Sequence, residues 1–213
     1  MFIPKNYREE DFKKILAFIC QNEFATLVLY DGEKPVASHL LMEAVEEDGA
    51  VAIYGHMSRG NPLWKTLDSN REALVIFQGA HTYVSATWYD HVNVPTWNYV
   101  SVHAYGKPAL VTDHDEVYAL LSRLVKRHEN DSFYRMETLP QDFVEKEMKG
   151  VAAFKMEVER LEAAFKLSQN RNDADHQNIV IQLERRGDEL SEGVASAMRA
   201  NRPFFLDEST SPD

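Results

Sequence analysis

Residues 52–65 carry the sequence Ala-Ile-Tyr-Gly-His-Met-Ser-Arg-Gly-Asn-Pro-Leu-Trp-Lys, in which an apolar run leads through a polar turn into a short helical segment. The run up to Tyr54 is typical of a strand, and Asn61-Pro62 is typical of an N-cap followed by proline at the first helical position. Helix N-termini attract anions, and Arg59 and Lys65 add positive charge on the two sides of the turn. The sequence therefore predicts an anion site here, with an ordinary strand-to-helix connection as the alternative.

The charge balance argues against one class of function. The chain has 213 residues, with 23 Lys and Arg against 34 Asp and Glu, and a net charge of -11. Proteins that bind the phosphate backbone of DNA usually carry a basic face, so direct DNA binding is doubtful.

A single cysteine, Cys20, leaves no disulfide framework within the chain, and no apolar run approaches the roughly 18 residues of a membrane span. We expect a cytoplasmic protein that does not enter a membrane.

Hydrophobic patterning on both sides of residues 52–65 predicts a mainly β chain with peripheral helices (α+β). Apolar or alternating runs predict strands at 24–30, 35–42, 50–54, 72–78, 81–89, 97–105 and 151–158. Helical spacing predicts helices at 7–22, after an Asn6 to Glu9 capping box, at 62–69, from 113 onward, and as a C-terminal pair after residue 176. Short strands without βαβ alternation favour an antiparallel barrel of about six strands or more.

Residues 97–105 form the most informative of these strands. One of its faces carries Trp97, Tyr99, Ser101 and His103, whereas a strand face in contact with water usually carries Lys, Glu and Thr. A partner subunit or a flat ligand would both account for this aromatic face.

Common catalytic and nucleotide-binding motifs are absent from the sequence. There is no Walker loop, no G-x-G-x-x-G, no H-E-x-x-H and no G-x-S-x-G. The histidines His81, His91 and His103 lie in neighbouring segments, but none has a recognised ligand spacing and no cysteine supports them. We therefore predict no metal site and assign no catalytic residue.

Five segments occur in a fixed order along the chain, at residues 37–41, 55–65, 77–89, 94–99 and 165–170. Together they resemble the family of FMN-binding negative transcriptional regulators typified by PaiB, which is similar in fold to the pyridoxamine-phosphate oxidases. The resemblance implies an antiparallel split β-barrel and a homodimer with FMN at or near the subunit interface. It also implies a flavin-binding domain at residues 1–170, a helical extension at 171–203 and a disordered acidic tail at 204–213.

The resemblance implies that the turn at residues 58–61 holds the FMN phosphate, with Arg59 as the main cation and backbone N–H groups near Asn61 as donors. Gly60 stands where the oxidases have a second basic residue. The residues assigned to FMN in this way are His39, Leu40, Tyr54, Gly55, His56, Ser58, Arg59, Gly60, Asn61, Lys65, Trp97, Asn98, Tyr99 and Ser101. Those assigned to a second ligand are His81, Lys166, Gln169 and Asn170.

Two alternatives to a PaiB-type regulator are open at this point. One is an FMN-dependent oxidoreductase that acts on a small metabolite, because a bound flavin can support redox chemistry. The other is a split barrel that binds haem through a histidine. The absorbance spectrum of the purified protein separates flavin from haem.

Overall fold

The structure is a computed structural model that describes residues 1–47 and 49–202. The expected acidic tail lies outside the described residues. The α-helices are α1 (Phe12–Gln21), α2 (His114–His128), α3 (Gln141–Met148), α4 (Asp173–Arg186) and α5 (Glu189–Asn201). The strands are β1 (Arg8–Glu9), β2 (Phe24–Tyr30), β3 (Pro35–Glu47), β4 (Ala50–Ser58), β5 (Ala73–Val84), β6 (Thr96–Val111) and β7 (Val151–Lys166). Short 3-10 helices are η1 (Lys5–Tyr7), η2 (Pro62–Thr66), η3 (Ala86–Trp88) and η4 (Met136–Thr138).

The strands of the described residues form one sheet that closes on itself. Their order is β1-β7-β4-β3-β2-β5-β6, and β7 also pairs with β6. The β2–β3 hairpin, β3–β4 and β4–β7 are antiparallel pairs. This ring-like closure, with helices at the periphery and a helical pair at the C-terminal end, confirms the predicted fold class. Among the described residues, no helix combines the length and the apolar character needed to cross a membrane.

The chain divides into two compact units. Unit 1 comprises Met1–Phe18, Gln78–Val102 and the chain from Glu162 on, and unit 2 comprises Ile19–Phe77 and His103–Leu161. The long strands β5, β6 and β7 each contribute residues to both units. The division expected at residue 170 stays a prediction.

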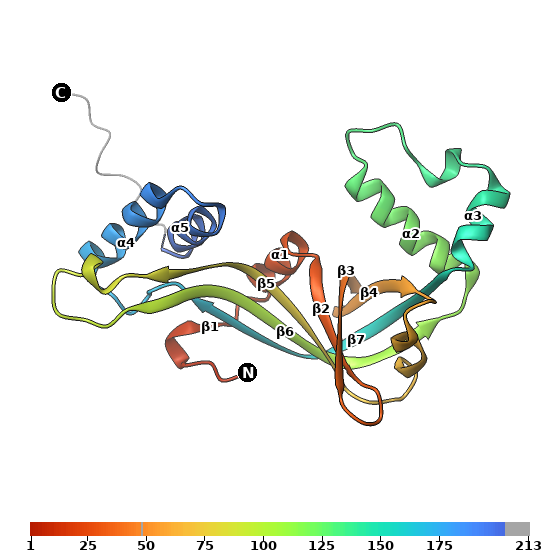
Figure 1. Ribbon diagram of the computed structural model, residues 1–213, viewed down its shortest axis with the longest axis horizontal. Helices are drawn as coiled ribbons and strands as arrows, with labels where there is room; N and C mark the ends of the chain where they lie inside the picture. The colour runs from red at the N-terminus through yellow and green to blue at the C-terminus, as the bar shows by residue number, and fades with distance from the viewer. Residues whose placement is uncertain (48, 203–213) are drawn as a thin grey trace. The chain divides into compact units, whose positions relative to one another are not determined.

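Unit 2 contains β2, β3, β4 and the helices α2 and α3. Its interior includes fully buried Met42, Ile53 and Phe154. Leu120 and Leu124 of α2 pack on Ala52 and Tyr54, and Figure 1 shows α2 and α3 above the labels of β4 and β7. Asp113 caps α2, as predicted, because its carboxylate accepts a hydrogen bond from the N–H of Glu116 at 2.9 Å.

In unit 1, the helices α4 and α5 cover one face of β5 and β6 (Figure 1). Val84 and Val100 lie in a buried cluster with Ile179, Leu183 and Met198 of the two helices. Gly187, with φ of +68°, ends α4, and the carboxylate of Asp188 caps α5. The C-terminal helical pair is therefore part of the core of this unit.

Several predicted boundaries were wrong, for physical reasons. The first helix begins at Phe12, because Asp11 caps it by accepting hydrogen bonds from the N–H groups of Lys13 and Lys14. Residues 8–9, expected in this helix after the capping box, instead pair with β7 as β1.

Strand lengths were also underestimated. β3 runs to Glu47, β4 runs to Ser58, and β5 is continuous through Gly79-Ala80, where a break was expected. A Cβ at Gly193 of α5 would lie 2.7 Å from the Cβ of Ala80, so the small residues there serve close helix packing and not a chain break. Residues 85–89, expected as strand, begin instead with Ser85 as the cap of η3.

Gly106 illustrates how a glycine in a long strand can be required for packing. A Cβ at Gly106 would lie 2.1 Å from the carbonyl oxygen of Glu157 on β7, where backbone cannot easily yield. We expect Gly106→Ala to lower the free energy of unfolding by about 1–3 kcal/mol or more, measured by urea denaturation. Gly60→Ala is the control, because its Cβ would meet only the Ser58 hydroxyl, at 3.3 Å. Equal stability of the two variants would contradict this packing role.

His176 of α4 predicts a pH dependence of stability. Burial, and secondarily the charge of Arg202, lowers the pKa of the imidazole from 6.5 to about 4. Below pH 6.5 the unfolded chain therefore binds more protons at His176 than the folded chain does. The free energy of unfolding is unaffected by this group above pH 6.5 and decreases as the pH drops toward 4, by up to about 3 kcal/mol. In unfolding curves recorded from pH 7 to pH 4, His176→Gln should remove this part of the decline. A decline of the same size in the variant would refute the assignment.

Candidate functional site

The predicted phosphate turn follows β4 directly. Asn61 caps η2 by accepting a hydrogen bond from the N–H of Leu63 at 3.1 Å, and Pro62 is the first helical residue, as predicted. The side-chain Nδ2 of Asn61 donates a hydrogen bond to the Ser38 hydroxyl of β3 at 3.1 Å. These contacts fix the turn against the neighbouring strand.

Arg59 is held at three points although its side chain is exposed. Its N–H donates to the carbonyl oxygen of Gly150 at 2.8 Å, and its Nε donates to the carbonyl oxygen of Val151 at 2.9 Å. The guanidinium lies 5.0 Å from the ring centroid of Trp64, whose Nε1 donates to the carbonyl oxygen of Arg59 at 3.0 Å. Within residues 1–47 and 49–202, the two terminal nitrogens of Arg59 have no partner and remain for an anion, on a side chain that is already oriented.

The backbone amides of this turn are engaged within the chain. The N–H of Gly60 donates to the Ser58 hydroxyl, and the N–H of Asn61 donates to the carbonyl oxygen of Ser58. The N–H of Leu63 donates to the side-chain oxygen of Asn61. The amides near Asn61, which the resemblance implies as phosphate donors, therefore already have partners within the chain, and a five-residue 3-10 helix adds little dipole.

Side chains of the turn do fit a phosphate group. The Ser58 oxygen accepts from Gly60, which leaves the hydroxyl hydrogen available to donate. Ser58, Arg59 and Lys65 are all exposed. The donor set is thus two terminal nitrogens of Arg59, one hydroxyl and one ammonium group.

Sequence patterns did not single out Ser38, Trp64 or Val151, which position this turn. Ser38 and Trp64 lie inside segments that carried the family resemblance, but no pattern linked either residue to Arg59. Val151 lies 92 positions away from Arg59, and only the β4–β7 register reveals the contact.

The residues expected along the flavin edge in unit 2 lie on both faces of their strands. His39 is exposed, and its Nδ1 shares a hydrogen bond of 3.0 Å with the Thr26 hydroxyl. Leu40 is half-buried. The Tyr54 hydroxyl donates to Glu47 at 2.8 Å, and a Cβ at Gly55 would lie 2.6 Å from the Phe154 ring. Tyr54 and Gly55 therefore have evident packing roles.

His56 is the next residue of β4 on the Tyr54 face. Its Nδ1 is buried and has no hydrogen-bond partner among the described residues. Burial lowers the pKa of the His56 imidazole, so the ring is neutral near pH 7.

Of the predicted face of Trp97, Tyr99, Ser101 and His103, only Trp97 is exposed, and in unit 1 its ring neighbours are Tyr83 and His81 of β5. Trp97 and Tyr83 are 47% and 43% exposed, their rings are 6.3 Å apart, and the Trp97 Nε1 donates to His81 at 3.2 Å. Tyr99 is half-buried, whereas Ser101 is buried. We call Trp97, Tyr83 and His81 the aromatic patch.

The remaining predicted residues of unit 1 lie among other contacts. Asn98 is fully buried, and its amide donates to the Ser168 hydroxyl at 2.9 Å. Burial, with a smaller effect of Arg171, lowers the pKa of the Lys166 ammonium, which donates to Thr96 at 2.6 Å. Two further residues were assigned to the second ligand. Gln169 accepts a hydrogen bond from the N–H of Leu167, and exposed Asn170 accepts one from the Tyr7 hydroxyl.

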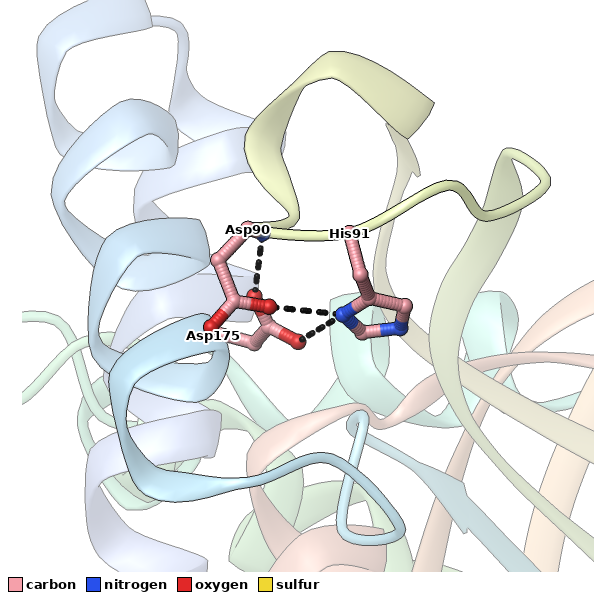
Figure 2. A group of neighbouring side chains, drawn as sticks. All are labelled: Asp90, His91 and Asp175. Carbon is pink, nitrogen blue, oxygen red and sulfur yellow. Dashed lines mark hydrogen bonds and ion pairs between the residues drawn. The ribbon is translucent and has the colours of Figure 1, made fainter.

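A separate polar cluster lies where the loop after η3 meets α4 (Figure 2). The Nδ1 of His91 lies 2.6 Å from the Asp90 carboxylate and 3.4 Å from that of Asp175. Asp175 is 1% exposed, and its two oxygens also accept from the N–H of Asp90 and the amide of Asn172. The three groups are close enough to hold a cation, but both oxygens of Asp175 are engaged, so we assign the cluster to fastening the loop.

Comparison with known proteins agrees with the flavin-binding interpretation. The chain is 38% identical to "Protease synthase and sporulation protein PAI 2" of Bacillus subtilis, over 93% of this chain and 96% of that protein. The "FAD and Heme binding protein" of Mycobacterium smegmatis matches 82% of this chain and 80% of its own, with a TM-score of 0.58 and 18% identity.

The flavocytochrome Anf3 of Azotobacter vinelandii gives the same TM-score of 0.58 at 14% identity, over 80% of this chain and 75% of its own. These two structures support the fold alone. Residues 1–160 match the family model described as "Putative FMN-binding domain". The chain therefore belongs to this family of FMN-binding domains, which is the family that its sequence segments led us to expect.

Proposed function

We propose that the FMN phosphate is held by the side chains of Arg59, Ser58 and Lys65. The observation that carries this proposal is the fixed Arg59, whose backbone N–H, Nε and guanidinium face contact Gly150, Val151 and Trp64, while none of the described residues pairs with its terminal nitrogens. Such a side chain binds an anion with little loss of conformational entropy. FMN, when bound, would supply redox chemistry.

We further propose a regulatory role for the flavin-bound protein. The name of the Bacillus relative connects that protein with protease synthesis and sporulation. The net charge of -11 supports regulation through redox state or a protein partner, without direct contact with DNA phosphates. No group in the described residues forms a recognisable catalytic set, so a metabolic oxidoreductase is the weaker proposal.

A homodimer through the aromatic patch completes the proposal. Trp97 and Tyr83 stand on neighbouring strands of unit 1 and each leave more than two fifths of their surface exposed. Tryptophan and tyrosine are enriched in protein interfaces and carry much of their binding energy. FMN at or near this dimer interface remains part of the proposal.

Arg59→Ala tests the phosphate site. Loss of the charged donor should weaken FMN binding by about 1.5 to 3 kcal/mol, or roughly 10- to 150-fold, in a titration followed by flavin fluorescence. Arg71→Ala is the matched control, because Arg71 is also exposed and lies 5.0 Å from the ring centroid of Tyr30. Unchanged FMN affinity in Arg59→Ala, in a variant with normal unfolding, would rule out the site.

Paired substitution of Trp97→Ala and Tyr83→Ala tests the interface. The loss of both exposed aromatic rings should shift the protein from dimer toward monomer in sedimentation velocity runs at micromolar concentration. Phe133→Ala removes a fully exposed aromatic ring in unit 2 and should leave the dimer intact. A stable dimer in the double variant would place the interface elsewhere.

A further inference from the structure

Unit 2 contains a cavity that the proposed phosphate turn does not use. It lies between α2, α3 and the end of β4, and has a volume of about 520 Å³. Its lining includes Leu121 and Val125 of α2, Val144 and Met148 of α3, and His56 of β4. Cavities of about 300–1,000 Å³ are the usual size for small-molecule sites.

Most of the cavity surface is apolar and includes aromatic side chains. Tyr134 and Phe143 line it and are 46% and 47% exposed, which is unusual for two large rings in one place. A ligand in the cavity would remove this apolar surface from water, and the gain grows with the area covered. The lining therefore favours a ligand with an apolar, ring-containing body.

His56 is the polar group that distinguishes this cavity from an ordinary packing gap. Its buried Nδ1 lacks a hydrogen-bond partner among the described residues, and nearly all buried polar atoms in folded proteins have one. The ring is neutral near pH 7, so it offers an uncharged donor and acceptor to a ligand. The lining also includes His128 and the carboxylates of Glu129 and Glu147, and the two carboxylates disfavour an anionic ligand.

We propose that this cavity binds a small uncharged aromatic compound of two or three rings that carries one hydrogen-bonding group for His56. The cavity also adjoins the Arg59 contact, because Val151 lines it while its carbonyl oxygen accepts from Arg59. A ligand there can therefore influence the turn. Binding itself does not depend on FMN, so it is testable in the flavin-free chain.

The test uses 2-naphthol and its near-isostere 2-methylnaphthalene as probes, titrated into the flavin-free full chain and followed by calorimetry. We expect both to bind, with 2-naphthol about three- to tenfold tighter because one neutral hydrogen bond is added. His56→Phe should keep 2-methylnaphthalene binding and abolish the preference for 2-naphthol. His39→Phe, which changes an exposed histidine of the same sheet outside the cavity, should keep that preference.

Two further variants keep the test decisive. Leu139→Phe and Val144→Phe each add bulk to the lining, and at least one folded variant should bind both probes more than tenfold more weakly. Arg59→Ala should retain 2-naphthol binding even where FMN affinity is lost, which separates this proposal from the phosphate site. Absence of probe binding at millimolar concentration, an unchanged preference in His56→Phe, or displacement of 2-naphthol by FMN would each overturn the proposal.

Discussion

Closure of the sheet depends on the approach of β6 to β7, and that approach is possible because Gly106 has no side chain. The backbone of Glu157 occupies the space that any Cβ at this position would need. Once β7 is held in this way, it pairs with β4 along seven residues, from Ala52 opposite Glu157 to Ser58 opposite Val151. The end of that ladder is where the phosphate turn begins, so a packing constraint in one strand pair fixes the location of the proposed site.

The turn itself shows how an exposed arginine becomes a specific group. Carbonyl oxygens of Gly150 and Val151 and the ring of Trp64 restrain Arg59, although none of them carries a charge. The restraint removes rotamer freedom before a ligand arrives, which is a cost that a mobile lysine would incur on binding.

Much of the fold was predictable because its signals are local. The strands that begin at residues 24 and 35, the Asn61 cap with Pro62 and the start of the helix at residue 113 depend on neighbouring residues, and all were predicted correctly. The continuity of β5 and β6 was missed, because small residues at Gly79-Ala80 and at Gly106 serve contacts with distant segments. The same limit applied to the site: Arg59 was identified from its neighbours, but its Val151 contact and the engagement of the turn amides follow only from the three-dimensional pairing.

The buried pair of Asn98 and Ser168 has a consequence for where the protein can be shortened. The family match ends at residue 160, so α4, α5 and Ser168 lie beyond it. Removing them would leave the Asn98 amide without its hydrogen bond to Ser168 and would uncover Val84 and Val100. The end of the family model is therefore not expected to be a boundary of independent folding, because residues after 160 complete the packing of the part that precedes them.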